Sequence, residues 1–247
     1  MDYLQHDPKS VSIAEFMKIY GVGKTNATKL YDSGMRTLQD IRKHPNLLNS
    51  KQLIGLKYVD DLQIKIPRNE ITELFNIVKS HLHEIVPKEL IEAEPCGSYR
   101  RGKELCGDID ILITRNDDDA IEHILEQLLE RLHKINFIKE TLALTKDLGL
   151  STKSQFMGIC RLRNDLPFRR IDIKVYSKDC YAFALLGFTG SAEFNRNLRQ
   201  KAKELGYSLS DDGLTQLSTG KKITCLTEKE IMQALGENYI PPTKRDI

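Results

Sequence analysis

The sequence predicts an α+β fold made of three consecutive parts: a helical subdomain over 10–68, a mixed-sheet subdomain over 69–179 and a small α/β subdomain over 180–247. Three observations support this division. Helical patterns fill the first part and stop at Pro67, alternating apolar strands mark the second, and short strands between two helices mark the third. The 247 residues suffice for a sizeable core.

Charge and cysteine content narrow the possible environments. Lys and Arg number 37 and Asp and Glu number 35, so a nucleic-acid surface would have to come from uneven charge distribution. Basic residues do concentrate at 100–103, 161–174 and 196–203. The five cysteines lack Cys-x-x-Cys spacing, which argues against disulfides and zinc and predicts a reducing, intracellular environment. Since no segment is typical of a signal peptide or membrane span, no membrane association is expected.

The first part has a recognisable turn between two helices. Helices are predicted over 11–20, with Ser10 or Ser12 as the cap, and over 24–33, with Gly21-Val22-Gly23 between them. This is the helix-hairpin-helix pattern, whose turn contacts a nucleic-acid backbone without reading bases. An ordinary helical hairpin is the alternative. A short helix after Thr37 and helices over 50–66 and 69–85 are expected to follow.

The second part centres on residues 96–114. Side chains alternate along the predicted strand 108–114, which gives one face two carboxylates and a leucine: Asp108, Asp110 and Leu112. Neighbouring carboxylates repel, and a hard cation such as Mg²⁺ would neutralise them. The preceding loop, flexible and cationic, suits phosphate oxygens. The alternative is a solvated Asp-x-Asp beside an ordinary basic turn.

The remaining elements follow from periodicity. An amphipathic helix is predicted over 117–134, and strands over 137–145, 155–162 and 168–176. In the last strand Asp172 lies between Arg170 and Lys174, and spacing alone makes it an ordinary surface ion pair. The third part has an apolar run over 180–188, a helix capped by Ser191, a small sheet over 204–226, a helix over 227–235 and an extended tail.

Several strings resemble one family in the same order. GSYRRG followed by CGDIDILIT resembles the palm of family X DNA polymerases, the nucleotidyltransferases that include polymerases beta, lambda and mu and terminal deoxynucleotidyl transferase. IYGVGKTNATKLYDSGMRTLQDIR, RIDIKV and FTGSAEFNRNLR resemble further segments of that family. The resemblance implies a helix-hairpin-helix DNA-binding subdomain, a nucleotidyltransferase palm and a nucleotide-selection subdomain.

The resemblance also implies roles for individual residues. Asp108, Asp110 and Asp172 would be catalytic and bind divalent ions, Mg²⁺ or Mn²⁺, and Na⁺ or K⁺ would bind the backbone carbonyls of Met17, Ile19 and Val22. The nucleotide would contact Arg68, Gly97, Ser98, Arg101, Gly107, Gly187, Phe188, Gly190 and Asn195. DNA would contact Gly21, Gly23, Lys24, Arg170, Lys174, Arg196 and Arg199.

Three features, two of them departures from the family pattern, refine the prediction. Family members carry a lyase domain before the hairpin, and only about ten residues precede it here, so lyase activity is not expected. Gly187 stands where polymerases beta and lambda have tyrosine, a likeness to polymerase mu that predicts acceptance of ribonucleotides. The connection over 163–167 is short, which favours templated synthesis.

The sequence therefore predicts a monomeric nuclear repair polymerase that uses dNTPs on gapped or primer-template DNA, in gap filling or end joining. Alternatives remain open: a template-independent terminal nucleotidyltransferase, an RNA-tailing or small-molecule nucleotidyltransferase, and a non-catalytic DNA-binding repair scaffold. A structural protein without a substrate is a further alternative.

Overall fold

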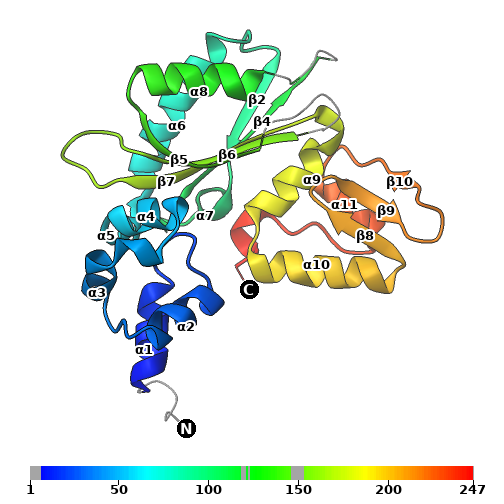
Figure 1. Ribbon diagram of the computed structural model, residues 1–247. Coiled ribbons are helices and arrows are strands. Elements are labelled where there is room, and N and C mark those ends of the chain that lie inside the picture. The colour runs from blue at the N-terminus through cyan, green and yellow to red at the C-terminus, as the bar shows by residue number, and fades with distance from the viewer. Residues whose placement is uncertain (1–6, 118–120, 122, 146–152, 247) are drawn as a thin grey trace. The chain divides into compact units, whose positions relative to one another are not determined.

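The computed structural model describes residues 7–117, 121, 123–145 and 153–246 (Figure 1). The chain divides into two compact units, an N-terminal unit that ends at Ile64 and a C-terminal unit that begins at Lys65. Each unit has its own core of buried apolar side chains. In the described residues, no helix is both long and apolar enough to span a membrane.

The N-terminal unit is helical, as predicted. Its elements are α1 (Pro8–Phe16), α2 (Lys24–Asp32), α3 (Leu38–Lys43), η1 (Pro45–Leu47), α4 (Ser50–Lys57) and α5 (Val59–Leu62). The first helix begins earlier than expected because the Asp7 carboxylate, rather than Ser10 or Ser12, accepts from the first free amides and Pro8 occupies the first turn. Ser12 lies inside α1, and its hydroxyl donates to the Arg36 carbonyl.

The predicted helix over 50–66 is wrong at its C-terminal end. The helical run breaks at Tyr58 between α4 and α5. Residues Ile66–Pro67 instead form strand β1, which pairs antiparallel with β3 (Leu105–Cys106). This pairing joins residues almost forty positions apart, so no local periodicity could predict it.

The C-terminal unit contains the predicted mixed sheet. Five strands lie in the order β2-β4-β7-β6-β5. They are β2 (Ile91–Pro95), β4 (Ile109–Arg115), β5 (Ile138–Thr145), β6 (Lys153–Cys160) and β7 (Arg169–Tyr176). Strands β4 and β7 are parallel, whereas the other neighbours are antiparallel. The predicted strands over 108–114, 137–145, 155–162 and 168–176 are thus confirmed within about two residues.

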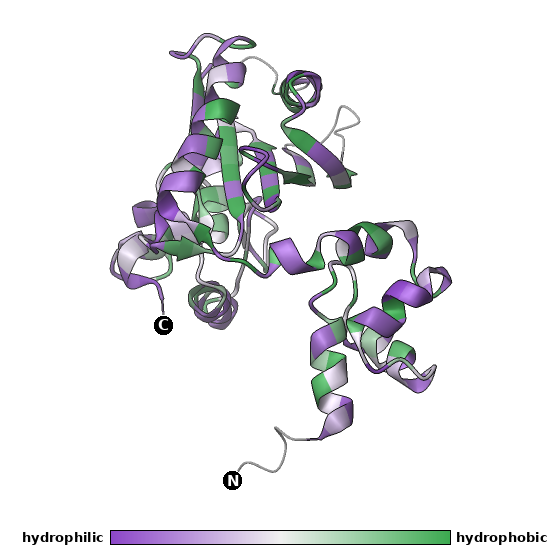
Figure 2. Cartoon of the chain, turned by 90° about the vertical axis from the view of Figure 1, so that its left-hand side faces the viewer, coloured by the Kyte–Doolittle hydropathy of each residue, from purple (hydrophilic) through white to green (hydrophobic). Residues whose placement is uncertain are grey.

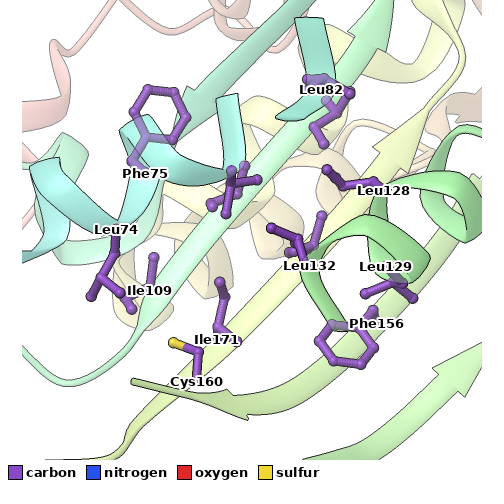
Figure 3. Close-up of a cluster of buried hydrophobic side chains, with 14 of the residues drawn as sticks. Leu74, Phe75, Leu82, Ile109, Leu128, Leu129, Leu132, Phe156, Cys160 and Ile171 are labelled. Atoms are coloured by element: carbon purple, nitrogen blue, oxygen red, sulfur yellow. The ribbon is translucent and has the colours of Figure 1, made fainter. Parts of the chain in front are cut away.

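The two faces of this sheet differ. Helices α6 (Arg68–His83) and α8 (Ile124–Lys134) cover one face, where their leucines meet isoleucines of β4 and β7 (Figure 3). Helix α9 (Lys178–Thr189) contacts the other face through a smaller cluster around Leu112 and Tyr176. The predicted alternation along β4 is confirmed, because its three isoleucines lie in the first cluster and Leu112 in the second.

Helix α8 is shorter than predicted. It begins at Ile124, after His123 in the left-handed conformation at φ 65°, and residues 118–120 and 122 of the predicted 117–134 helix lie outside the described residues. Its buried leucines match the predicted apolar face. Figure 2 shows the corresponding alternation of hydrophilic and hydrophobic residues along the helices.

The last part of the unit surrounds a separate apolar cluster. After α9 come α10 (Ala192–Glu204), β8 (Tyr207–Ser210), β9 (Gly213–Gln216), β10 (Lys222–Ile223), α11 (Glu228–Ala234) and η2 (Pro242–Lys244). The small sheet and last helix are confirmed, and the apolar run over 180–188 is helical. Pro242–Lys244 form a 3-10 turn within the expected extended tail.

Candidate active site

Two of the three predicted aspartates are direct neighbours. Asp110 on β4 and Asp172 on β7 are register partners in the parallel pair, so both side chains project from the same face. Asp108 precedes β4 by one residue and lies two positions before Asp110. Asp172 is only 3% exposed, which removes the interpretation that it is an ordinary surface ion pair. The parallel pairing therefore brings carboxylates from distant segments together.

Two cations lie among these carboxylates. The Arg170 guanidinium forms an ion pair with Asp108 and lies 3.9 Å from Asp172 Oδ2. The Lys174 ammonium lies 3.8 Å from Asp110 Oδ1. Asp108 is thus paired with Arg170. Within the described residues, no group of three acidic, histidine or cysteine side chains lies close enough together to hold a metal ion.

The chemistry of Asp110 and Asp172 nevertheless fits a divalent cation. Asp172 Oδ1 is buried without a hydrogen-bond partner. Burial raises the pKa of Asp172, and burial raises the pKa of Asp110 to about 6, with Lys174 lowering it and Asp172 raising it further. Both shifts show that negative charge is costly at this position. Hard carboxylate oxygens whose charge is only partly compensated are suitable ligands for Mg²⁺ or Mn²⁺.

The residues before β4 form a short helix instead of the expected flexible loop. Helix α7 (Gly97–Arg100) and the following residues fold into a closed turn, which we call the Gly-Ser turn (96–103). Gly97 has φ +56°, and a Cβ there would lie 2.3 Å from Asp110 Oδ2. The Cys96 amide also donates to the Asp110 carbonyl over 2.8 Å. Glycine at position 97 is therefore what allows this turn to pack against the carboxylate.

The two arginines of the Gly-Ser turn have different partners. Arg100 forms a bidentate pair with Glu228 and so faces α11. Arg101 donates from Nη1 to the Thr189 carbonyl over 2.7 Å, and its charge reaches Asp110, whose pKa it lowers. A Cβ at Gly190 would lie 3.2 Å from Arg101 Nη1. Of these two arginines, Arg101 is the one whose charge acts on Asp110.

Arg68 contacts the Gly-Ser turn, and Lys65 lies near Gly107. Arg68 Nη1 donates to the Tyr99 carbonyl over 2.6 Å, and its guanidinium lies over the Tyr99 ring. Its observed contact is therefore with Tyr99 of the Gly-Ser turn. Lys65, which the sequence reasoning missed, places Nζ 3.7 Å from the position of a Cβ on Gly107. The pairing of β1 with β3, invisible in local sequence, is what puts it there.

The C-terminal end of α9 lies against strand β7. The Phe188 ring contacts the Lys174 ammonium at 3.6 Å and the Tyr176 ring at a centroid distance of 5.7 Å. Asn195 donates from Nδ2 to the Gly187 carbonyl over 2.6 Å, which ties α10 to α9. Lys174, predicted as a DNA contact, is buried between Asp110 and Phe188.

Other predicted DNA contacts lie on exposed surfaces. Arg196 pairs with Glu193 one turn earlier on α10, and Arg196 and Arg199 both line a shallow pocket on that helix. In the N-terminal unit, Gly21 has φ +84° and its carbonyl accepts from Gln52. Gly23 caps α2, which begins at Lys24.

The predicted monovalent-cation site consists of backbone carbonyls in the turn after α1. The Ile19 carbonyl already accepts from the Val22 amide over 3.0 Å, although a carbonyl oxygen has a second lone pair. Gly55 of α4 packs directly on this turn, since a Cβ there would lie 2.4 Å from the Tyr20 carbonyl oxygen. Helix α4 therefore holds the turn in place.

Comparison with known proteins agrees with this geometry. Residues 14–63 match the fingers domain of DNA polymerase lambda, residues 65–178 the DNA polymerase beta palm and residues 184–246 the DNA polymerase beta thumb. The chain belongs to the family X DNA polymerases. It thus carries fingers, palm and thumb, and the aspartates, the Gly-Ser turn and β7 all lie in the palm.

Comparison with individual proteins indicates the same family. The chain is 35% identical to DNA polymerase lambda of Arabidopsis thaliana, over 100% of this chain and 49% of that protein. It is 37% identical to DNA polymerase lambda of Rattus norvegicus, over 98% of the chain and 44% of the relative. DNA-directed DNA/RNA polymerase mu of Homo sapiens is 28% identical, over 94% of this chain and 51% of that protein. The chain therefore spans about half the length of these family X relatives.

Proposed function

We propose that this protein is a repair-type DNA polymerase that adds nucleotides to a primer 3′-hydroxyl on a DNA template and releases pyrophosphate. The observation that carries the proposal is the register pairing of Asp110 with Asp172 beside Gly97, whose missing side chain leaves room for the carboxylate. Matches to polymerases lambda and mu support the same reaction class. A scaffold without catalysis would not need this arrangement.

The aspartates of the palm would hold the metal ions. Asp108, Asp110 and Asp172 would bind Mg²⁺, or Mn²⁺ in its place, and the ions would supply charge that favours both the attacking 3′-oxygen and the leaving pyrophosphate. Arg170, between Asp108 and Asp172, would orient Asp172 or a primer phosphate. Lys174 would hold the Asp110 carboxylate and the Phe188 ring.

The nucleotide would lie between the Gly-Ser turn and the end of α9. Ser98, Arg101 and Gly107, with Lys65 beside Gly107, would contact the triphosphate. Gly187, Phe188, Gly190 and Asn195 would line the base and sugar. The predicted contact of Arg68 with the triphosphate stays a prediction, since the Arg68 guanidinium already donates to the Tyr99 carbonyl of the Gly-Ser turn.

The DNA would be held by both units separately. Gly21, Gly23 and Lys24 of the hairpin would contact a phosphate of the primer strand, with Na⁺ or K⁺ at the carbonyls of residues 17, 19 and 22. Arg196 and Arg199 on α10 would meet the template strand. Because the relatives are lambda- and mu-type polymerases, we propose gap filling or end joining in the nucleus by a monomer.

Primer extension tests the proposal directly. The wild-type protein should extend a primer on gapped and recessed DNA with Mg²⁺ or Mn²⁺, and EDTA should abolish extension. Asp172→Asn should remove extension while leaving DNA affinity unchanged, because one metal ligand is lost from a buried position. Asp165→Asn is the matched control, since this aspartate has a 74% exposed side chain on the 163–167 connection.

Extension by Asp172→Asn at the wild-type rate would contradict the assignment of the metal ligands. Absence of extension by the wild type on every DNA would contradict the polymerase itself. A single-stranded primer supplies the third arm: faster extension there than on annealed DNA would indicate terminal transfer instead of templated synthesis.

A further inference from the structure

We infer that Asp246 is a positioning residue that orients Arg101 for the nucleotide triphosphate. This inference rests on the proposed polymerase function and adds a residue outside the predicted site. It begins from an ion pair between the last part of the chain and the Gly-Ser turn: Arg101 Nε lies 2.8 Å from Asp246 Oδ1. The other carboxylate oxygen lies 2.8 Å from Lys103 Nζ.

The contacts fix the plane of the Arg101 guanidinium. Nε donates to Asp246 and Nη1 donates to the Thr189 carbonyl, so two of its three nitrogens are held by acceptors from different elements. Among the described residues, Nη2 has no protein acceptor. The guanidinium therefore keeps one nitrogen, with two N–H groups, for an incoming anion.

The segment that carries Asp246 is packed into the fold through the residues before it. The preceding Arg245 is 0% exposed. Its guanidinium donates to Glu228 and to the Ile240 carbonyl, and its carbonyl accepts from the Ser191 hydroxyl. Thr243 also lies against the Gly-Ser turn, with Cγ2 at 3.3 Å from the position of a Cβ on Gly102. The residues before Asp246 are thus held by contacts with Gly102, Ser191 and Glu228.

The charges also indicate that Asp246 positions Arg101 and does not block binding of the triphosphate. Burial acts to raise the pKa of Asp246, but hydrogen bonds from Lys103 and Arg101 outweigh burial and lower it, so the carboxylate stays ionised at neutral pH. One carboxylate facing two cations leaves net positive charge for a triphosphate. Partners that orient metal-ligating side chains typically change affinity or activity about 10- to 100-fold when mutated, and we expect an effect within this range for a partner that orients a phosphate-binding side chain.

Kinetics of Asp246→Asn test the inference. On gapped DNA we expect KM for a dNTP to rise about tenfold, with DNA affinity and melting temperature close to wild type. Asp246→Glu, which keeps the carboxylate, should recover part of the loss. In an Arg101→Ala background the Asp246→Asn change should add nothing further, because Asp246 acts through Arg101.

Unchanged KM, or an additive effect in the Arg101→Ala background, would overturn the inference. A lower KM would also overturn it, and would indicate that Asp246 competes with the triphosphate. Binding of a non-reactive dNTP analogue to the protein–DNA complex gives a second readout that does not need turnover. If the wild type binds the analogue but never extends a primer, the polymerase proposal fails while the positioning role is still measured.

Discussion

At the scale of single residues, the missing side chain of Gly187 leaves open space at the C-terminal end of α9. Its φ lies outside the left-handed region. Outside its own helix, the only described atom that a Cβ there would approach is Asp211 Cβ, at 4.0 Å. The backbone is held by the hydrogen bond from Asn195 to the Gly187 carbonyl. The position therefore admits a side chain without strain, so its glycine is not demanded by packing. We propose that the missing side chain relaxes discrimination against a 2′-hydroxyl.

Comparison of dNTP and rNTP insertion by wild type and Gly187→Tyr tests this hypothesis. The wild type should insert both with similar kcat/KM, and the tyrosine should raise the preference for dNTP by about 10- to 100-fold through contact with the extra hydroxyl. Gly187→Ala is the control, since one methyl group fits the available space. A strong dNTP preference in the wild type would refute the hypothesis.

At the scale of elements, a buried ion network joins α7, α9 and α11. Glu228 at the start of α11 is 6% exposed and pairs with Arg100 on one side and the fully buried Arg245 on the other. Arg100 also donates to the Thr189 hydroxyl. Burial acts to raise the pKa of Glu228, but hydrogen bonds from Arg100 and Arg245 outweigh burial and lower it below the usual 4.5.

Glu228→Gln should lower the free energy of unfolding by about 3–5 kcal/mol at neutral pH, because two arginines lose their shared anion. The folded-state pKa is depressed, so the ionised carboxylate stabilises the fold above pH 4.5 and this contribution disappears as pH falls through the lower folded-state pKa. Denaturant unfolding at several pH values should show the difference between wild type and variant shrinking in acid.

The matched control for this prediction is Glu237→Gln. Glu237 forms an exposed pair with Lys201, with both side chains 42% accessible, so its loss should cost at most about 1 kcal/mol at any pH. A constant difference between wild type and Glu228→Gln down to strong acid would contradict the ionic origin of the stabilisation.

At the scale of the whole molecule, each unit has a core of its own, so a defect in one should leave the other intact. Gly55 offers a test in the N-terminal unit. Gly55→Ala would place a Cβ 2.4 Å from the Tyr20 carbonyl oxygen and 2.8 Å from its amide nitrogen, which forces α4 away from the hairpin turn. The expected loss of stability is about 1–3 kcal/mol.

Hydrogen exchange checks the location of this effect. Amides of residues 7–63 should exchange faster in Gly55→Ala, whereas those of the five-stranded sheet should keep wild-type protection. Gly23→Ala is the control in the same unit, because, apart from its chain neighbours, no atom in the described part of the chain lies within 4 Å of its added Cβ. Faster exchange throughout β4 and β7 would show that the units unfold together.

Much of the candidate site could be predicted from the sequence, for a physical reason. Alternation along a strand is a local property, so the separation of Asp110 and Leu112 from the three isoleucines was predicted correctly. The role of Asp172 came only from resemblance to the family, because its neighbours in sequence are cations. The structure explains those cations, since Arg170 pairs with Asp108, directly before β4, and Lys174 lies near Asp110 on β4.

What the sequence alone determined is the family, the order of the helices and strands and the faces of those strands, because these depend on short patterns along the chain. Only the tertiary structure decided which distant segments meet. The register of β4 on β7, the pairing that brings Lys65 to Gly107 and the contact of Asp246 with Arg101 all join residues far apart in sequence. Such contacts depend on packing and charge across the fold, and no local periodicity encodes them.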